Sequence, residues 1–265
     1  MAQRTLLATI DIGNSAATYG IHRGSVILRS GFTKSCNIPK LAKSEALGRV
    51  LTHSNKVIVS SVVPYLTNRL VKMAIAKMGQ ESVYVVGRNV HPRVPMRYKR
   101  RALGSDRLVN IYGALRFYEP PLLVIDFGTA ITFDYISKRG IFEGGLIVPG
   151  IETSWKALQK GAALLPSFKK VEILRGGFVG RDTKSAMHAG LLYGFGALTD
   201  GLIRRFRDKY GSKILKILAT GGFASRIEPY TMGFDRVDPL HTIKSLALIY
   251  RNEIQGDNNE KAESA

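Results

Sequence analysis

Two acidic turns, one in each half of the chain, constrain the fold more than any other feature of the sequence. A short β-prone run, Thr5–Ile10, leads into Asp11-Ile-Gly-Asn14, and a second run, Leu122–Ile125, leads into Asp126-Phe-Gly-Thr129. Each turn is followed by two further segments that are predicted as strands. A theme that recurs in this way is typical of a fold assembled from two similar units. We therefore predict an α/β fold with two similar halves that face each other and bring both turns into one cleft.

The predicted elements alternate between strands and helices in both halves. In the first half we expect strands at 5–10, 17–22, 25–30, 56–60 and 82–86, and helices at 41–53, 64–78 and 105–117. In the second half we expect strands at 122–126, 130–137, 140–149 and 213–220, and helices at 151–163, 182–209 and 241–254. The boundary is placed at Pro120-Pro121, which gives a first half of 1–118, a second half of 119–254 and a polar, disordered tail of 255–265.

The composition is that of an ordinary globular protein. A chain of 265 residues with 45% hydrophobic content can bury a sizeable core without disulfides or metals. Its single cysteine, Cys36, excludes an intramolecular disulfide and fits a reducing compartment. The five histidines are scattered, so we expect no structural metal site. Because the first apolar run is too short for a signal sequence or a membrane span, we expect a cytoplasmic protein without a membrane segment.

The chain is strongly basic, with 39 Lys and Arg against 20 Asp and Glu and a formal net charge of +19. Such an excess fits attraction of anionic substrates, nucleic-acid binding or a generally basic proteome. The positive residues are spread along the chain, and the local clusters, Arg97–Arg101 and Arg204–Lys209, are short. Nucleic-acid binding is therefore the less favoured interpretation of the charge.

The residues of the two acidic turns are suited to phosphate binding. Gly13 and Gly128 let the backbone approach a phosphate group closely, and donors for phosphate oxygens follow them: Asn14, Ser15 and Thr129. Ordinary tight turns are the alternative, because Asp, Gly and Asn are common in turns. Two such turns, each after a buried-type run, favour phosphate binding. No Gly-x-x-x-x-Gly-Lys-Ser/Thr run and no strand-linked Gly-x-Gly-x-x-Gly competes with this interpretation.

The aspartates of these turns need a cation to act on phosphate, because a carboxylate and a phosphate repel each other. A bridging cation removes the repulsion. Mg²⁺ suits Asp11, and a second cation is expected near Asp126. A third turn, Gly221-Gly222, ends the strand predicted at 213–220 and would offer a flat backbone surface to adenine or ribose. Gly-Gly is also a common strand-to-helix turn, so this signal is weak by itself.

Leu103-Gly-Ser-Asp106-Arg107 opens the helix predicted at 105–117. A helix start beside an arginine favours an anionic ligand, and Asp106 is a candidate for the base that accepts a proton from a substrate hydroxyl. An N-terminal helix cap is the simpler interpretation of this aspartate on its own. Thr183 likewise either contacts the substrate or helps Asp182 to cap a helix.

At this point the motifs resemble a known family, the type III pantothenate kinases. Six segments match that family in order and spacing, and together they cover nearly the whole chain to about residue 254: Asp11–Ser15, Val59–Pro64, Leu103–Arg107, Asp126–Ala130, Gly144–Gly150 and Asp182-Thr183. Two positions and one segment depart from the usual pattern. Ser15 stands where the family usually has threonine, and Asp182 stands where it usually has asparagine. The segment before Leu103, Met96–Ala102, differs from the family's usual segment, which often carries Tyr, Asn and Pro.

The resemblance implies the actin-like ATPase fold, also called the acetate and sugar kinase/Hsp70/actin fold. It implies ATP-dependent phosphorylation of pantothenate on its primary hydroxyl, the first step of coenzyme A synthesis. It further implies Mg²⁺, which Asp11 would hold through water, a monovalent cation (K⁺ or NH₄⁺) and a homodimer.

The resemblance also assigns roles to individual residues. The nucleotide-binding positions are Asp11, Gly13, Asn14, Ser15, Thr18, Gly128, Thr129, Gly221 and Gly222, and the substrate-binding positions are Gly104, Ser105, Asp106, Arg107 and Thr183. Asp126 would bind the monovalent cation. Asp106 would accept the proton of the hydroxyl, which reverses the capping interpretation, while Arg107 would hold the pantothenate carboxylate. Two other functions remain open from the residues: a kinase of another small hydroxy acid, and a regulatory or nucleic-acid-binding protein that keeps the fold without catalysis.

Overall fold

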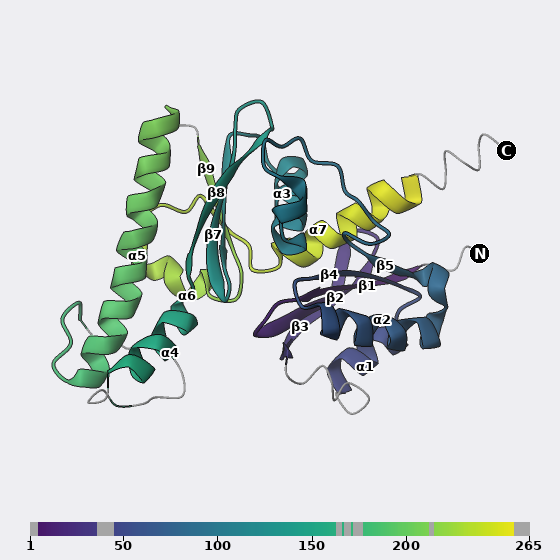
Figure 1. Cartoon of the computed structure of the whole chain (residues 1–265), viewed down its shortest axis with the longest axis horizontal. Helices are drawn as coiled ribbons and strands as arrows, with labels where there is room; N and C mark the ends of the chain where they lie inside the picture. Colours follow the sequence, from purple (N-terminus) through teal and green to yellow (C-terminus); the bar gives the residue numbers. More distant parts are fainter. Residues whose placement is uncertain are drawn as a thin grey trace. The chain divides into compact units, whose positions relative to one another are not determined.

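The computed structural model describes residues 5–35, 45–162, 166, 171, 177–211 and 215–256. The chain forms two compact units. Figure 1 labels their helices and strands. The first unit contains the described parts of Met1–Tyr118 and Leu240–Ala265, and the second contains those of Glu119–Pro239.

The first unit is built on a five-stranded mixed sheet with the order β3-β2-β1-β4-β5. Its strands are β1 (Leu6–Ile12), β2 (Ala16–Arg23), β3 (Val26–Lys34), β4 (Lys56–Ser61) and β5 (Val83–Val85). The first three strands form an antiparallel meander, and β4 and β5 join parallel to β1. The central strands β1 and β4 read as nearly continuous apolar runs because both of their faces are covered.

The second unit repeats this topology, with the order β10-β9-β6-β7-β8. Its strands are β6 (Leu122–Phe127), β7 (Ala130–Ile136), β8 (Phe142–Pro149), β9 (Lys216–Thr220) and β10 (Arg236–Val237). Again three strands form an antiparallel meander and two join in parallel. Each strand of the first sheet therefore has a counterpart in the second, as the repeat in the sequence predicts.

The helices follow the predicted ranges closely. Those of the first unit are α1 (Glu45–Thr52), α2 (Pro64–Met78), α3 (Ser105–Phe117) and α7 (His241–Tyr250), which continues into a π-helical turn, Arg251–Gln255. Those of the second unit are α4 (Ile151–Gly161), α5 (Thr183–Tyr210) and α6 (Ala224–Ile227). Pro64 is the first residue of α2, where its missing N–H costs little. No helix in the described ranges is long and apolar enough to cross a membrane.

The last helix differs from the predicted grouping, because α7 belongs to the first unit and not to the half at 119–254. It packs on α3, where His241 Nε2 lies 2.9 Å from Asn110 O and Thr242 Oγ1 donates to Asn110 Oδ1 at 2.8 Å. Gly113 of α3 lies so close to Ser245 that no β-carbon would fit between them. Of the tail expected at 255–265, residues 255 and 256 still lie in helical geometry, and residues 257–265 fall outside the described ranges.

Candidate functional site

The first acidic turn lies at the end of β1. Asp11 pairs with Thr18 of β2 on one side and with Ser60 of β4 on the other. Gly13 N donates to Ala16 O at 2.9 Å and closes the turn. Within this turn the side chains of Asn14 and Ser15 are exposed. Hydrogen-bond donors for an anion are therefore accessible to solvent at the end of β1.

Ser35, directly after β3, anchors this turn. Its N–H donates to Ser15 O at 3.0 Å, and its hydroxyl donates to Gly13 O at 2.5 Å. The side chain is buried, so these bonds are shielded from water. Sequence reasoning missed Ser35 because nothing near it in the sequence marks a contact with a turn some twenty residues earlier.

The Gly104–Arg107 loop forms the start of α3. Gly104 is the N-cap residue and provides no side-chain cap, and Asp106 lies in the first turn of the helix. Asp106 Oδ1 accepts a hydrogen bond from Arg107 N at 2.7 Å. Burial raises the pKa of Asp106, and the bond from Arg107 N and the charge of Arg107 act in the opposite direction. A carboxylate with a raised pKa beside a cation is suited to accepting a proton.

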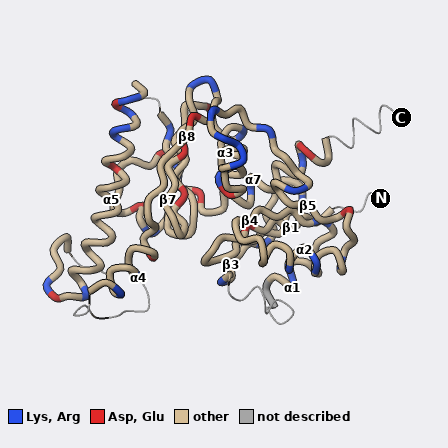
Figure 2. Tube along the Cα trace, viewed as in Figure 1, with Lys and Arg blue, Asp and Glu red and all other residues tan. Residues whose placement is uncertain are grey.

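Arg107 is itself buried. Its guanidinium carbon lies 5.3 Å from the centre of the Tyr98 ring, within the range of a cation–π interaction. Tyr98 belongs to a stretch from Arg88 to Arg101 that contains six Lys and Arg and no Asp or Glu. Figure 2 shows these charges along the chain that leads into α3.

Within the first unit, the acidic turn and the Gly104–Arg107 loop share one edge of the sheet. Ser60 and Ser61 of β4 are the register partners of Asp11 and Ile12 in β1. Both serines are hydrogen-bonded to Ser105 at the start of α3. The structure therefore brings two motifs together that lie far apart in the sequence.

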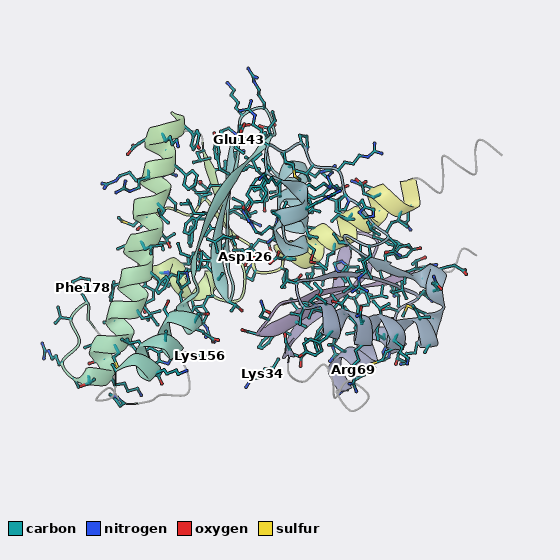
Figure 3. All side chains as sticks on the ribbon, viewed as in Figure 1. Lys34, Arg69, Asp126, Glu143, Lys156 and Phe178 are labelled. Carbon is teal, nitrogen blue, oxygen red and sulfur yellow. The ribbon has the colours of Figure 1, made fainter. Side chains whose placement is uncertain are left out.

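The second acidic turn occupies the corresponding position in the second unit. Asp126, labelled in Figure 3, lies near the end of β6 and pairs with Thr132 of β7 and Thr220 of β9. Gly128 N donates to Ala130 O at 3.1 Å and closes the turn. Gly221 directly follows β9, so the acidic turn and the Gly221-Gly222 turn meet at one sheet edge.

Gly221 is required on two grounds. Its φ of +90° favours glycine, and a β-carbon at this position would collide with Asp126 Oδ1 and Phe127 N. The carboxylate of Asp126 therefore lies directly against the backbone of the third turn. This contact lies where the sequence predicts a cation and a nucleotide.

Gly150 and Thr153 anchor the second turn as Ser35 anchors the first. Gly150 N donates to Thr129 O at 3.0 Å, and Thr153 Oγ1 donates to the same oxygen at 2.6 Å. An added β-carbon at Gly150 would collide with Gly128 O and Thr129 O. From the sequence, the glycines of Gly144–Gly150 allow close approach of a ligand or of another backbone segment. At Gly150 the neighbour is the backbone of the second turn.

Thr183 is the first residue of α5 and is exposed. Asp182 before it caps the helix: Ser185 N donates to Asp182 Oδ1 at 2.9 Å, and Ser185 Oγ donates to Asp182 Oδ2 at 2.8 Å. These hydrogen bonds lower the pKa of Asp182. Asp182 therefore caps α5, as one of the two sequence-based alternatives states. The hydroxyl of Thr183 lies at the first residue of this helix.

The carboxylates fit the expected cations by their chemistry. No group of three or more His, Cys, Asp or Glu that could hold a metal occurs in the described part of the chain. Mg²⁺ that travels with a nucleotide needs only one or two protein carboxylates, since phosphates and water complete its shell. Asp11, a carboxylate beside a glycine turn, is a donor of that kind. Asp126 has the corresponding position in the second unit and offers carboxylate oxygens to the expected monovalent cation.

The repeated sheet and its strand-end turns define the class of protein: the chain has the actin-like ATPase fold. The structure of MreB 5 of Spiroplasma citri bound to AMPPNP is similar, with a TM-score of 0.54, 12% identity and coverage of 98% of this chain and 99% of that chain. The (R)-2-hydroxyglutaryl-CoA dehydratase component A of Acidaminococcus fermentans is also similar, with a TM-score of 0.51, 14% identity and coverage of 92% and 96%.

Sequence comparison gives the particular family. The profile of the type III pantothenate kinase family matches residues 7–205. The type III pantothenate kinase of Brevibacillus brevis is 38% identical over 260 residues, which cover 94% of this chain and all of the relative. That of Moorella thermoacetica is 36% identical over 255 residues, with coverage of 92% and 98%. The chain belongs to the type III pantothenate kinase family.

Proposed function

We propose that this protein transfers the γ-phosphoryl group of ATP to the primary hydroxyl of pantothenate and produces 4′-phosphopantothenate, the first step of coenzyme A synthesis. Membership of the kinase family supports this assignment. One observation of the structure carries it further: the acidic turn after β1 and the Gly104–Arg107 loop share one sheet edge. A phosphate-binding turn beside a candidate base is the arrangement that phosphoryl transfer requires.

The roles of the residues follow from their chemistry. Arg107 would hold the carboxylate of pantothenate, and Asp106 would orient the primary hydroxyl and accept its proton. The hydroxyl oxygen then forms a bond to the γ-phosphorus while the bond from that phosphorus to the bridging oxygen breaks, and ADP leaves. Little covalent chemistry falls to the protein, so positioning and charge neutralisation dominate the rate enhancement.

The nucleotide would be held by the three glycine turns. We assign the phosphate contacts to Asn14, Ser15 and Thr129, with Thr18 of β2 opposite Asp11. We assign the nucleoside contact to Gly221-Gly222. Asp11 would hold Mg²⁺ through water, and Asp126 would hold K⁺ or NH₄⁺. These cations neutralise phosphate charge when they are bound. The position of Asp126 beside the Gly221-Gly222 turn, at one sheet edge, supports a cation and a nucleotide at neighbouring positions.

We also propose that Thr183 takes part in substrate binding and that the protein is cytoplasmic. We further propose that it forms a homodimer. The family resemblance implies the homodimer, and the second unit offers exposed apolar side chains to a partner: Leu146, Ile147, Leu158, Phe178, Val179 and Leu198. Size-exclusion chromatography with light scattering tests the dimer, and a monomeric mass at working concentration would contradict it.

The function is tested by ADP release coupled to a spectroscopic assay. Wild-type protein with ATP, Mg²⁺ and K⁺ should turn over with pantothenate, and other small hydroxy acids at the same concentration should give little. Asp106→Asn should lose about 10²-fold or more in kcat, which is typical when a general base is removed. Equal turnover of the variant and the wild type would remove Asp106 as the base, and absence of turnover with pantothenate would remove the assigned substrate.

A further inference from the structure

Ser105 lies between Gly104 and Asp106, yet its side chain is directed to β4. Its hydroxyl donates to Ser61 O at 2.9 Å. It accepts a hydrogen bond from Ser61 N at 3.0 Å and another from Ser60 Oγ at 3.2 Å. The start of α3 is thus connected to the end of β4 through a single oxygen atom.

The hydrogen-bonding capacity of this hydroxyl is fully used. A serine hydroxyl has one proton to donate and two lone pairs that accept. The bond to Ser61 O takes the proton, and the bonds from Ser61 N and Ser60 Oγ take both lone pairs. A substrate atom could bind Ser105 only by displacing one of these partners. This argues against the direct substrate contact expected for Ser105 from its place in the loop.

The partners of Ser105 occupy well-defined positions in the sheet. Ser60 is completely buried and is the register partner of Asp11, and Ser61 is the register partner of Ile12. The backbone of Val62, the next residue, donates to Ile12 O at 3.1 Å. Ser105 therefore connects α3 to the segment of β4 that is hydrogen-bonded to the strand end carrying the first acidic turn.

We propose that Ser105 is a positioning residue for phosphoryl transfer. It holds the start of α3 against β4, and so fixes Asp106 and Arg107 relative to Asp11. The inference rests on the proposed function, because it assigns Ser105 a role in that reaction. Rigid support by hydrogen bonds of this kind decides whether catalytic groups keep their productive geometry.

The first test compares Ser105→Ala with Ser137→Ala. Ser137 lies in the β7–β8 turn, where its hydroxyl donates to Ile141 O at 3.2 Å, and it has no part in the site. Ser105→Ala should lower kcat/KM for pantothenate about tenfold, the loss expected when a hydrogen bond or two that hold a site are removed. Its KM for ATP should change less than about twofold, since the acidic turn keeps its own anchors. Ser137→Ala should leave both constants unchanged.

A purely structural role predicts a different result for Ser105→Ala: a lower melting temperature with kcat/KM for pantothenate unchanged. That outcome would overturn the proposal. A double-mutant cycle separates positioning from direct substrate contact. If Ser60 acts through Ser105, Ser60→Ala should lower kcat/KM in the same direction, and the double variant should resemble Ser105→Ala alone. Independent, additive effects of the two substitutions would assign Ser105 to the substrate instead.

Hydrogen exchange provides a readout that does not depend on turnover. The amide of Ser61 donates to Ser105 Oγ, so Ser105→Ala should speed its exchange about tenfold or more, while the amide of Ser137 keeps its wild-type rate. If the amide of Ser61 is protected from exchange in the wild type, but the wild type does not phosphorylate pantothenate, then the proposed function fails. The hydrogen bonds between Ser105 and β4 would still be confirmed. Unchanged exchange at Ser61 in Ser105→Ala would contradict the hydrogen bonds between Ser105 and β4.

Discussion

The carboxylate of Asp106 lies directly against the Cα of Gly104, and a β-carbon at position 104 would collide with Asp106 Oδ1. The φ of Gly104 is −60°, an ordinary value for any residue. A β-carbon at this position would therefore displace the Asp106 carboxylate, although the backbone conformation itself is open to any residue. The close contact also explains why a substitution at position 104 should act on catalysis through Asp106.

Gly104→Ala should displace the carboxylate and lower kcat by about 10²-fold, the usual consequence of moving a catalytic group by about 1 Å. Gly161→Ala is the matched control, because an added β-carbon there meets no atom within 4 Å. Steady-state kinetics of both variants with pantothenate give the comparison. Wild-type kcat in Gly104→Ala would mean that the carboxylate does not need its observed position.

The pH dependence of the reaction should reflect the raised pKa of Asp106. A base works only when it is ionised, so kcat/KM for pantothenate should fall as the pH falls through this pKa. Because burial raises that pKa, the acid limb of the profile should lie above the range of an ordinary aspartate. Kinetics in mixed buffers at constant ionic strength measure the limb. The same limb in Asp106→Asn would assign it to another group.

Local sequence patterns were sufficient for the strands and turns but not for the contacts between them. The acidic turns at Asp11 and Asp126 follow continuous apolar runs and contain glycine, so sequence alone predicts a buried strand and a tight turn. The partnerships of Ser35 and Ser105 cannot be predicted in this way. Each joins a serine to a backbone far away in the sequence, and a hydrogen bond over such a separation leaves no periodic signal.

The placement of α7 shows the same limit. Its apolar side chains predict a packed helix at 241–254, but they fit any apolar partner, and sequence order suggested the second half. The partner is decided by contacts with α3, where Gly113 allows close approach and Asn110 binds Thr242. Strand β10 was missed for a simpler reason: two residues, Arg236–Val237, are too few for a periodic pattern.

Gly221→Ala should impair nucleotide-dependent turnover more than it impairs folding. An added β-carbon meets Asp126 Oδ1 and also strains the backbone, whose φ is +90°. Gly79→Ala separates the two effects, because φ is +80° there but the surroundings are open. Both variants should lose about 1 kcal/mol of stability from the strained φ. Only Gly221→Ala should lower kcat/KM for ATP, by about tenfold or more, and weaken activation by K⁺. Equal kinetic losses in both variants would contradict the role of Asp126.

Exposed basic residues before the Gly104–Arg107 loop should speed the capture of the anionic substrate. Met1–Tyr118 carries 19 Lys and Arg against only 4 Asp and Glu, and Arg97, Lys99 and Arg101 are exposed. Their combined replacement by serine should lower kcat/KM for pantothenate about threefold at low salt and flatten its salt dependence.

Two controls make this charge effect specific. The alcohol analogue, in which –CH₂OH replaces the carboxylate of pantothenate, should react equally well with both forms because it carries no charge. Replacing Lys138, Arg139 and Lys156 by serine removes the same charge from exposed positions of the second unit and should leave the salt dependence unchanged. An equal loss for the neutral analogue would indicate a structural effect of the loop instead.

Acid should destabilise the protein through His22 of β2, which is buried with its Nε2 2.9 Å from Thr9 Oγ1 of β1. Burial, followed by the charge of Arg251, lowers the pKa of His22 from 6.5 to about 4. The unfolded chain therefore binds a proton more readily, and stability that is complete above pH 6.5 should be lost as the pH falls toward 4. The pKa shift corresponds to a loss of at most about 3 kcal/mol in the free energy of unfolding.

Urea unfolding of wild type and His22→Gln between pH 7 and 4 measures this loss. Because Gln does not titrate, the free energy of unfolding of the variant should fall less steeply as the pH is lowered. Parallel curves for the two proteins would place the acid sensitivity elsewhere, since no other substitution distinguishes them.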